Sequence, residues 1–226
     1  VAKCIVMHMG YHNANFNYTM AGSNLATVDQ QQDLGVLILR DLKWNAQVEE
    51  SYKIANRNLG FISRNFLCKT KDIVLPLYKS LVRPYLEHAV QFWSPHMRGD
   101  IAKLERIQHR ATKLIPQLRH RSYEDRLKEL GLIILEQRRL RGQLIETFKY
   151  LKGFNNVSPV GLFDRDHNIR TRNNGAKLVE KRFATTIAQH FFPIAISRIW
   201  NNLPAAVVGA ESVNAFKNAL DSHWDT

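Results

Sequence analysis

The strongest constraint on the fold is the run of residues 72–93, in which apolar side chains recur at helical spacing. At about 100° per residue, one face collects Val74, Tyr78, Leu81, Val82, Tyr85, Ala89 and Phe92. Lys79, Arg83 and Glu87 fall on the opposite face. A helix of this length would extend about 33 Å and bury a wide apolar stripe. We therefore expect it to form the central helix of a helical domain.

Pro84 lies in the middle of this run. Proline cannot donate the hydrogen bond that the Ser80 carbonyl would accept, and it disfavours the helical region for Arg83. The apolar stripe nevertheless keeps its register on both sides of the proline. The sequence therefore predicts one kinked helix from Asp72 to Trp93.

Three further segments have helical periodicity, and each carries an apolar stripe. The stripe of the first, from Gln47, is Val48, Tyr52, Ala55, Leu59, Ile62 and Phe66. The stripe of the second, residues 101–115, is Ile101, Leu104, Gln108, Ala111 and Leu114. The stripe of the third, residues 135–152, is Leu140, Leu144, Phe148 and Leu151. Ser122 with Asp125 resembles a capping box and predicts a short helix that ends at Leu130.

The N-terminal region has the short runs and turn residues of β-strands. The predicted strands are Lys3–Met9, Asn17–Ala21 and Asp33–Leu39, and the last is the most apolar. So small a sheet would be marginal alone and would need a partner surface. We therefore predict a mainly α chain (α+β) with a small N-terminal antiparallel β-meander, a helical bundle and a C-terminal helical extension. A composition break at residues 153–176 predicts a loop.

The charge of the chain points to a polyanionic partner. Lys and Arg number 32 against 20 Asp and Glu, which gives a net charge of +12. Two predicted helices carry basic stripes opposite their apolar stripes: Lys53, Arg57 and Arg64 on one, and Lys103, Arg106, Arg110 and Lys113 on the other. Such stripes can follow a phosphate backbone without reading bases. The alternative is a pair of solvated helix faces that bind nothing, and each stripe taken separately favours this alternative.

The candidate metal-binding segments of the sequence lack residues that a metal site needs, and no catalytic motif is found. Metal-ligand spacing occurs in Cys4, His8 and His12 and in the segment 164–175, which contains Asp164, Asp166 and Asn168. The first group offers only three ligands. The second has Ile169 where a calcium loop needs Gly, and Gly175 where it needs Glu. The sequence also lacks a Gly-rich phosphate loop. We therefore predict no catalytic residue and no metal site.

The two cysteines, Cys4 and Cys68, cannot build a disulfide framework, which favours a reducing intracellular compartment, the nucleus and/or the cytoplasm. The sequence has no run of about 20 apolar residues, so we expect no membrane partner. The chain starts at Val1 inside a strand-like run. We interpret it as a fragment of a longer protein.

Five short segments of the sequence occur in the same order as in a known protein family. They are Asp33–Val36, Leu75–His96, Ile107–Lys113, Tyr123–Leu127 and Leu135–Gly142. In these phrases the chain resembles the segment after the palm in reverse transcriptases of non-LTR (LINE-type) retrotransposons, in the Jockey-like and chicken-repeat-like groups. The resemblance continues in the tail, at Phe191–Pro193 and Trp200–Pro204, where it implies no role.

This resemblance implies a division of the chain into three parts. Residues 1–46 would be the end of a palm, residues 47–120 a helical thumb-like region, and residues 121–226 a C-terminal helical extension. The first part would include a primer-grip-like hairpin with Leu34, Gly35 and Val36, which supports the 3′ end of the primer. Gly35 would allow close approach of the backbone, although glycine in a strand is equally typical of a bulge.

The function implied by the resemblance is RNA-directed DNA polymerisation, of which this fragment would supply the grip on template and primer. The Tyr/Phe-x-Asp-Asp turn that holds catalytic metal ions in this family is absent from the sequence. We therefore expect the fragment alone to be inactive and Mg²⁺ to be required only by the complete polymerase. The expected partners are an RNA template and DNA primer, or their RNA–DNA hybrid, and the missing palm and fingers of the same polyprotein. The alternative is a non-enzymatic helical protein-interaction scaffold.

Overall fold

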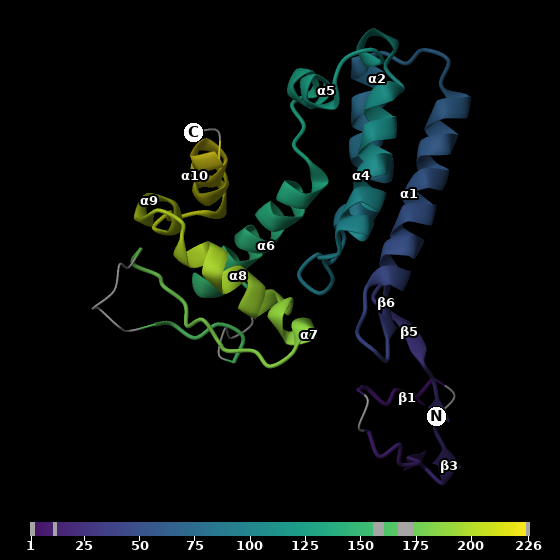
Figure 1. The fold of residues 1–226 in the computed structure, drawn as a ribbon, viewed down its shortest axis with the longest axis vertical. Helices are drawn as coiled ribbons and strands as arrows, with labels where there is room; N and C mark the ends of the chain where they lie inside the picture. Colours follow the sequence, from purple (N-terminus) through teal and green to yellow (C-terminus); the bar gives the residue numbers. More distant parts are fainter. Residues whose placement is uncertain (1–2, 11–12, 156–160, 167–173, 225–226) are drawn as a thin grey trace. The chain divides into compact units, whose positions relative to one another are not determined.

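The computed structural model describes residues 3–10, 13–155, 161–166 and 174–224. The chain forms two compact units, one of residues 1–89 with 93–135 and the other of residues 90–92 with 136–226. Each unit has its own hydrophobic core. The predicted fold class is confirmed, because the described chain is mainly helical and its strands lie near the N-terminus (Figure 1).

The strands of the first unit form separate two-stranded sheets. β1 (Ile5–Val6) pairs with β4 (Ala26–Thr27), β2 (Thr19–Met20) with β3 (Ser23–Asn24), and β5 (Gln30–Asp33) with β6 (Val36–Leu39). The β2–β3 and β5–β6 pairs have the antiparallel orientation predicted for the sheet, whereas β1–β4 is parallel, and none of the three pairs joins two of the predicted strands. Only β6 contributes to the core, through Val36. The strands predicted as Lys3–Met9 and Asn17–Ala21 are both shorter than expected.

The run Asp33–Leu39 is divided by a turn and does not form one strand. Leu34 and Gly35 have positive φ angles of 45° and 82°, and Asp33 pairs with Val36 across the turn. A two-residue turn with positive φ at both positions suits the twist of a hairpin, and glycine at the second position adopts it without strain. Leu34 and Gly35 therefore form the tip of a β-hairpin, and its likeness to a primer grip stays a prediction.

The helices of the first unit follow the hairpin. They are α1 (Asn45–Asn65), α2 (Lys71–Leu77), the π-helical turn η1 (Tyr78–Val82), α3 (Pro84–Glu87), α4 (Arg98–Lys113), the 3₁₀ turn η2 (Pro116–Leu118) and α5 (Tyr123–Leu130). The predicted stripe of α1 is confirmed, with Val48, Leu59 and Ile62 buried in the core. Ser122 caps α5 as expected, since its Oγ accepts a hydrogen bond from the Asp125 N–H at 3.1 Å.

The predicted central helix differs from the observed one in two ways. Arg83, which the sequence predicts to be pushed out of the helical region, has a helical conformation (φ −59°, ψ −36°), and the π turn lets its N–H donate to the Tyr78 carbonyl. The helix ends at Glu87, well before Trp93. The extra residue in the π turn rotates the helix, so the buried side chains are Val74, Tyr78, Val82 and Leu86. Leu81, Tyr85 and Phe92, which were predicted in the core, are exposed.

The second unit is built around aromatic side chains. Its helices are α6 (Leu135–Leu151), α7 (Thr186–Gln189), α8 (Phe192–Asn201), α9 (Ala205–Val208) and α10 (Val213–Trp224). The ring of Phe216 stacks on Phe148 at 4.4 Å and on Trp200 at 5.8 Å between centroids. Arg141 holds α10 through a two-point ion pair with Asp221, at 2.6 and 2.7 Å. By contrast, Phe183 and Phe191 are exposed.

The boundary between the units lies at residues 135–136, later than the sequence division at 120–121. Leu118, Leu127, Leu130 and Leu132 all pack in the core of the first unit, which places α5 there. The palm and thumb labels stay predictions. His12, Asn168 and Ile169, with most of the predicted loop at 153–176, lie outside the described residues.

Candidate nucleic-acid interface

Two helices that carry the predicted basic stripes, α1 and α4, pack side by side in the first unit (Figure 1). Lys103 pairs with Glu49, and Arg110 donates to the Asn56 amide oxygen; both pairs are 54 residues apart in sequence. A constant offset means that the helices run parallel, with both C-terminal ends at the same end of the pair. The structure therefore brings the two basic stripes onto neighbouring elements.

Two of the predicted basic residues are engaged by carboxylates. Lys103 bridges α4 and α1 by its ion pair with Glu49, and Lys53 pairs with Glu50 at 3.0 Å within α1. The hydrogen bond from Lys103 holds the pKa of Glu49 below its ordinary value, and the bond to Glu50 raises the pKa of Lys53. The carboxylates of Glu49 and Glu50 therefore offset much of the positive charge of Lys103 and Lys53.

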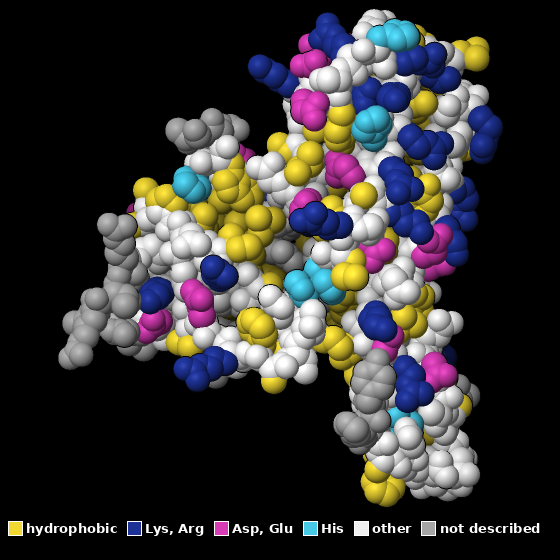
Figure 2. Space-filling view, viewed as in Figure 1, with side chains coloured by type: hydrophobic (Ala, Val, Ile, Leu, Met, Phe, Trp, Pro, Cys, Tyr) yellow, Lys and Arg dark blue, Asp and Glu magenta, His cyan; other side chains and the backbone are white. Residues whose placement is uncertain are grey.

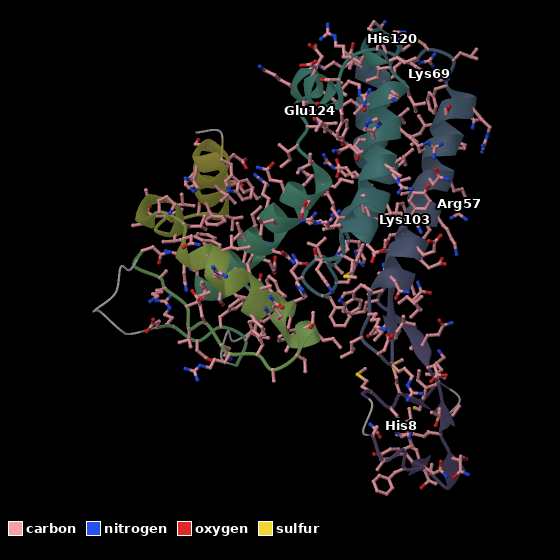
Figure 3. The ribbon with its side chains drawn as sticks, viewed as in Figure 1. His8, Arg57, Lys69, Lys103, His120 and Glu124 are labelled. Atoms are coloured by element: carbon pink, nitrogen blue, oxygen red, sulfur yellow. The ribbon has the colours of Figure 1, made fainter. Side chains whose placement is uncertain are left out.

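The other predicted cations keep their charge. Among the described residues, no carboxylate forms an ion pair with Arg57, Arg64, Arg106, Arg110 or Lys113. All of them are exposed. Figure 2 shows Lys and Arg side chains gathered over α1 and α4, and Figure 3 labels Arg57 on α1 and Lys103 on α4. This surface of uncompensated positive charge, which we call the basic face, consists of Arg57, Arg64, Arg106, Arg110 and Lys113.

One end of the basic face is hollowed into a pocket of about 430 Å³. It is lined by Leu59, Gly60, Ser63, Arg64, Arg110, Lys113, Leu114 and Arg119. The pocket therefore joins cations from α1, from α4 and from the segment after η2. Sequence reasoning missed Arg119, although the run Arg119-His120-Arg121 directly after the predicted helix stop was a visible signal.

The three primer-grip-like residues have different environments. Leu34 is 88% exposed at the tip of the β5–β6 hairpin, whereas Val36 is 3% exposed and belongs to the core. The Leu34 carbonyl lies 3.0 Å from Nε2 of His88, and a Cβ on Gly35 would lie 3.4 Å from the same atom. Gly35 thus serves the turn and the close approach of His88. Leu34 and Gly35 remain accessible to a ligand, and Val36 does not.

A larger pocket of about 690 Å³ lies beside this hairpin. Its polar lining includes Gln30, Gln32, Gln47, Glu50, Ser51 and His88. Gln47 is held in place because its side-chain oxygen accepts from the Leu37 N–H at 2.7 Å and its amide donates to Ser51 at 3.1 Å. The pocket offers amide, hydroxyl and imidazole groups next to the exposed hairpin tip.

Other kinds of site find no support in the part of the chain that the structure describes. Within residues 3–10, 13–155, 161–166 and 174–224, no three His, Cys, Asp or Glu side chains converge in a way that could hold a metal ion. None of the helices in these ranges combines the length and apolar character needed to cross a membrane. The basic face is thus the arrangement with the clearest chemistry.

Comparisons of the chain with protein-family models, with curated proteins and with solved structures gave no match.

Proposed function

We propose that the first unit holds a nucleic-acid duplex, the RNA–DNA hybrid of template and primer, as the thumb-like part of a non-LTR retrotransposon reverse transcriptase. The observation that carries this proposal is the basic face, in which exposed guanidinium and ammonium groups of two parallel helices form no ion pair with any carboxylate of the described residues. Unpaired cations attract phosphates at long range and gain by releasing counterions from the duplex.

The grip would be electrostatic and independent of base sequence. Arginines on an exposed helix face reach the sugar–phosphate backbone, and such contacts position a duplex without reading it. The hairpin tip at Leu34 and Gly35 would support the primer strand, as the resemblance implies. The carboxylates that perform polymerisation would come from other polypeptide.

The experiment measures binding of the full chain to an RNA–DNA hybrid by fluorescence anisotropy at about 0.1 M salt. The variant R57Q/R106Q removes one unpaired cation from each helix of the basic face. Loss of two phosphate contacts is expected to weaken binding about tenfold or more at this salt concentration. Two hybrids of unrelated sequence should bind equally.

The matched control is K43Q/K128Q, which lowers the net charge equally at exposed positions of the first unit outside the basic face. It should bind the hybrid within about twofold of the unaltered chain. Equal weakening by both variants would mean that overall charge, and not the basic face, is responsible. No hybrid binding by the unaltered chain would favour the protein-interaction scaffold instead.

A further inference from the structure

The pocket at the end of the basic face concentrates positive charge in a small volume. Arg64, Arg110, Lys113 and Arg119 line about 430 Å³, and none of the lining residues is acidic. Among the described residues, only Arg110 of these four has a side-chain hydrogen bond, and its partner Asn56 is neutral. Donors of the other three cations are therefore available to a ligand.

Part of this charge is offset by the ends of two helices. Arg64 lies in the last turn of α1, and Arg110 and Lys113 lie in the last turn of α4. Each helix C-terminus contributes about half a negative charge. The pocket therefore keeps a net charge of about +3, more than one singly charged phosphodiester would neutralise.

Gly60 explains how a guanidinium fits in the pocket wall. A Cβ at this position would lie only 3.3 Å from Nη1 of Arg64, and the Arg64 guanidinium lies over the glycine. Glycine inside a helix is destabilising relative to alanine. Here it leaves the room that Arg64 occupies at the pocket.

From these observations we propose that the pocket binds a phosphate group carrying at least two negative charges, at a site separate from the open part of the basic face. Two chemical sources fit: the terminal phosphomonoester of a strand, or neighbouring phosphates within a strand. The identification of nucleic acid as the source of this phosphate rests on the proposed function above. Phosphate binding by the pocket does not depend on that function, because the same cations would also bind a small polyphosphate.

The test uses inorganic pyrophosphate as the probe, with isothermal titration calorimetry on the full chain. Saturable binding at one site is expected. The variant R64Q/R119Q should weaken it about tenfold or more, since each arginine supplies charge-assisted hydrogen bonds. R57Q/R106Q, outside the pocket lining, should change it less than twofold.

Non-saturable binding of pyrophosphate, or equal losses in the two double variants, would overturn the proposal. Thermal unfolding of R64Q/R119Q should match that of the unaltered chain, because both arginines are exposed.

A comparison of hybrids with a 5′-phosphate and with a 5′-hydroxyl then distinguishes the two sources of the phosphate. If the unaltered chain binds the 5′-phosphate hybrid more tightly and R64Q/R119Q abolishes this preference, the pocket binds the terminal phosphate of a strand. If R64Q/R119Q weakens binding of both hybrids equally, the pocket binds internal phosphates. Pyrophosphate binding without any hybrid binding would contradict the proposed function and leave the pocket standing.

Discussion

Gln108 is a fully buried polar residue whose side chain joins three parts of the first unit. Its oxygen accepts from the Tyr78 hydroxyl at 2.8 Å, and its amide donates to the Tyr123 hydroxyl at 3.1 Å and to the Ile133 carbonyl at 3.0 Å. Glu105 closes the network by accepting from Tyr123 and from the Leu135 N–H. Buried networks of this kind fix one arrangement of their elements, because an unpaired member would be costly. This network orients α4, which carries three of the five residues of the basic face.

His109 lies next to this network and makes the stability of the first unit depend on pH. Its Nε2 lies 3.2 Å from Nη2 of the buried Arg126, and its ring packs on Tyr123 at 4.6 Å. Burial lowers the pKa of His109 below the ordinary 6.5, and the charges of Arg126 and Lys113 lower it further, against a smaller opposing effect of Glu105. An arginine can only donate, so the facing ring nitrogen must be an unprotonated acceptor.

The sign of the effect follows from the lowered pKa. Below about pH 6.5 the unfolded chain takes up a proton that the folded chain resists, so stability is lost as the pH falls through the folded pKa. In H109Q, the loss of stability between pH 7 and pH 5, measured by urea unfolding, should be smaller than in the unaltered chain. The exposed His120, labelled in Figure 3, provides the control: H120Q should keep the original pH dependence. The same dependence in H109Q would contradict this account.

At the scale of elements, local signals in the sequence place α5 well. The Ser122 hydroxyl accepts from the Asp125 N–H at 3.1 Å and donates to the Asp125 carboxylate at 2.8 Å. At the other end Gly131 takes the left-handed conformation, with φ 59°, that commonly ends a helix. Both features follow from residues within a few positions of each other, which is why the sequence could predict the Ser122 cap and the helix end at Leu130.

Removing this cap should loosen α5. S122A is expected to lower the free energy of unfolding by about 1 kcal/mol, since the Asp125 N–H loses its acceptor. S122T keeps a hydroxyl and should lose much less. Urea unfolding monitored by circular dichroism measures both. Equal stability of S122A and the unaltered chain would show that water replaces the cap at no cost.

The central helix shows where sequence reasoning stops. Periodicity at a fixed angle per residue assigned Leu81, Val82 and Tyr85 to the core. The π turn at Tyr78–Val82 advances the helix, so Val82 is buried as predicted, Leu81 and Tyr85 are exposed, and Leu86 is buried without having been predicted. No residue in the run marks a π turn. The candidate site has the same limit: the stripes on α1 and α4 were visible in the sequence, whereas the pairing of Lys103 with Glu49 and the approach of Arg119 to the pocket depend on tertiary packing.

At the scale of the whole molecule, the two units have separate hydrophobic cores, and only the core of the first unit supports the basic face. The basic face and its pocket belong entirely to the first unit, whose core includes Leu104 of α4. The second unit has a separate core around Phe216, which is fully buried between Phe148 and Trp200. If binding is a property of the first unit, damage to each core should have a different effect on it.

Two truncations of similar severity test this division. F216A should destabilise the second unit by about 3–5 kcal/mol, and L104A should destabilise the first by about 2–5 kcal/mol, because each leaves a cavity in a closed core. Near the temperature at which each variant begins to unfold, hybrid binding measured by anisotropy should survive in F216A and be lost in L104A. The reverse pattern would place the binding surface on the second unit. Binding requires α4 and its arginines to stay ordered. Loss of binding in both variants would therefore mean that the first unit does not stay ordered when the second unit unfolds.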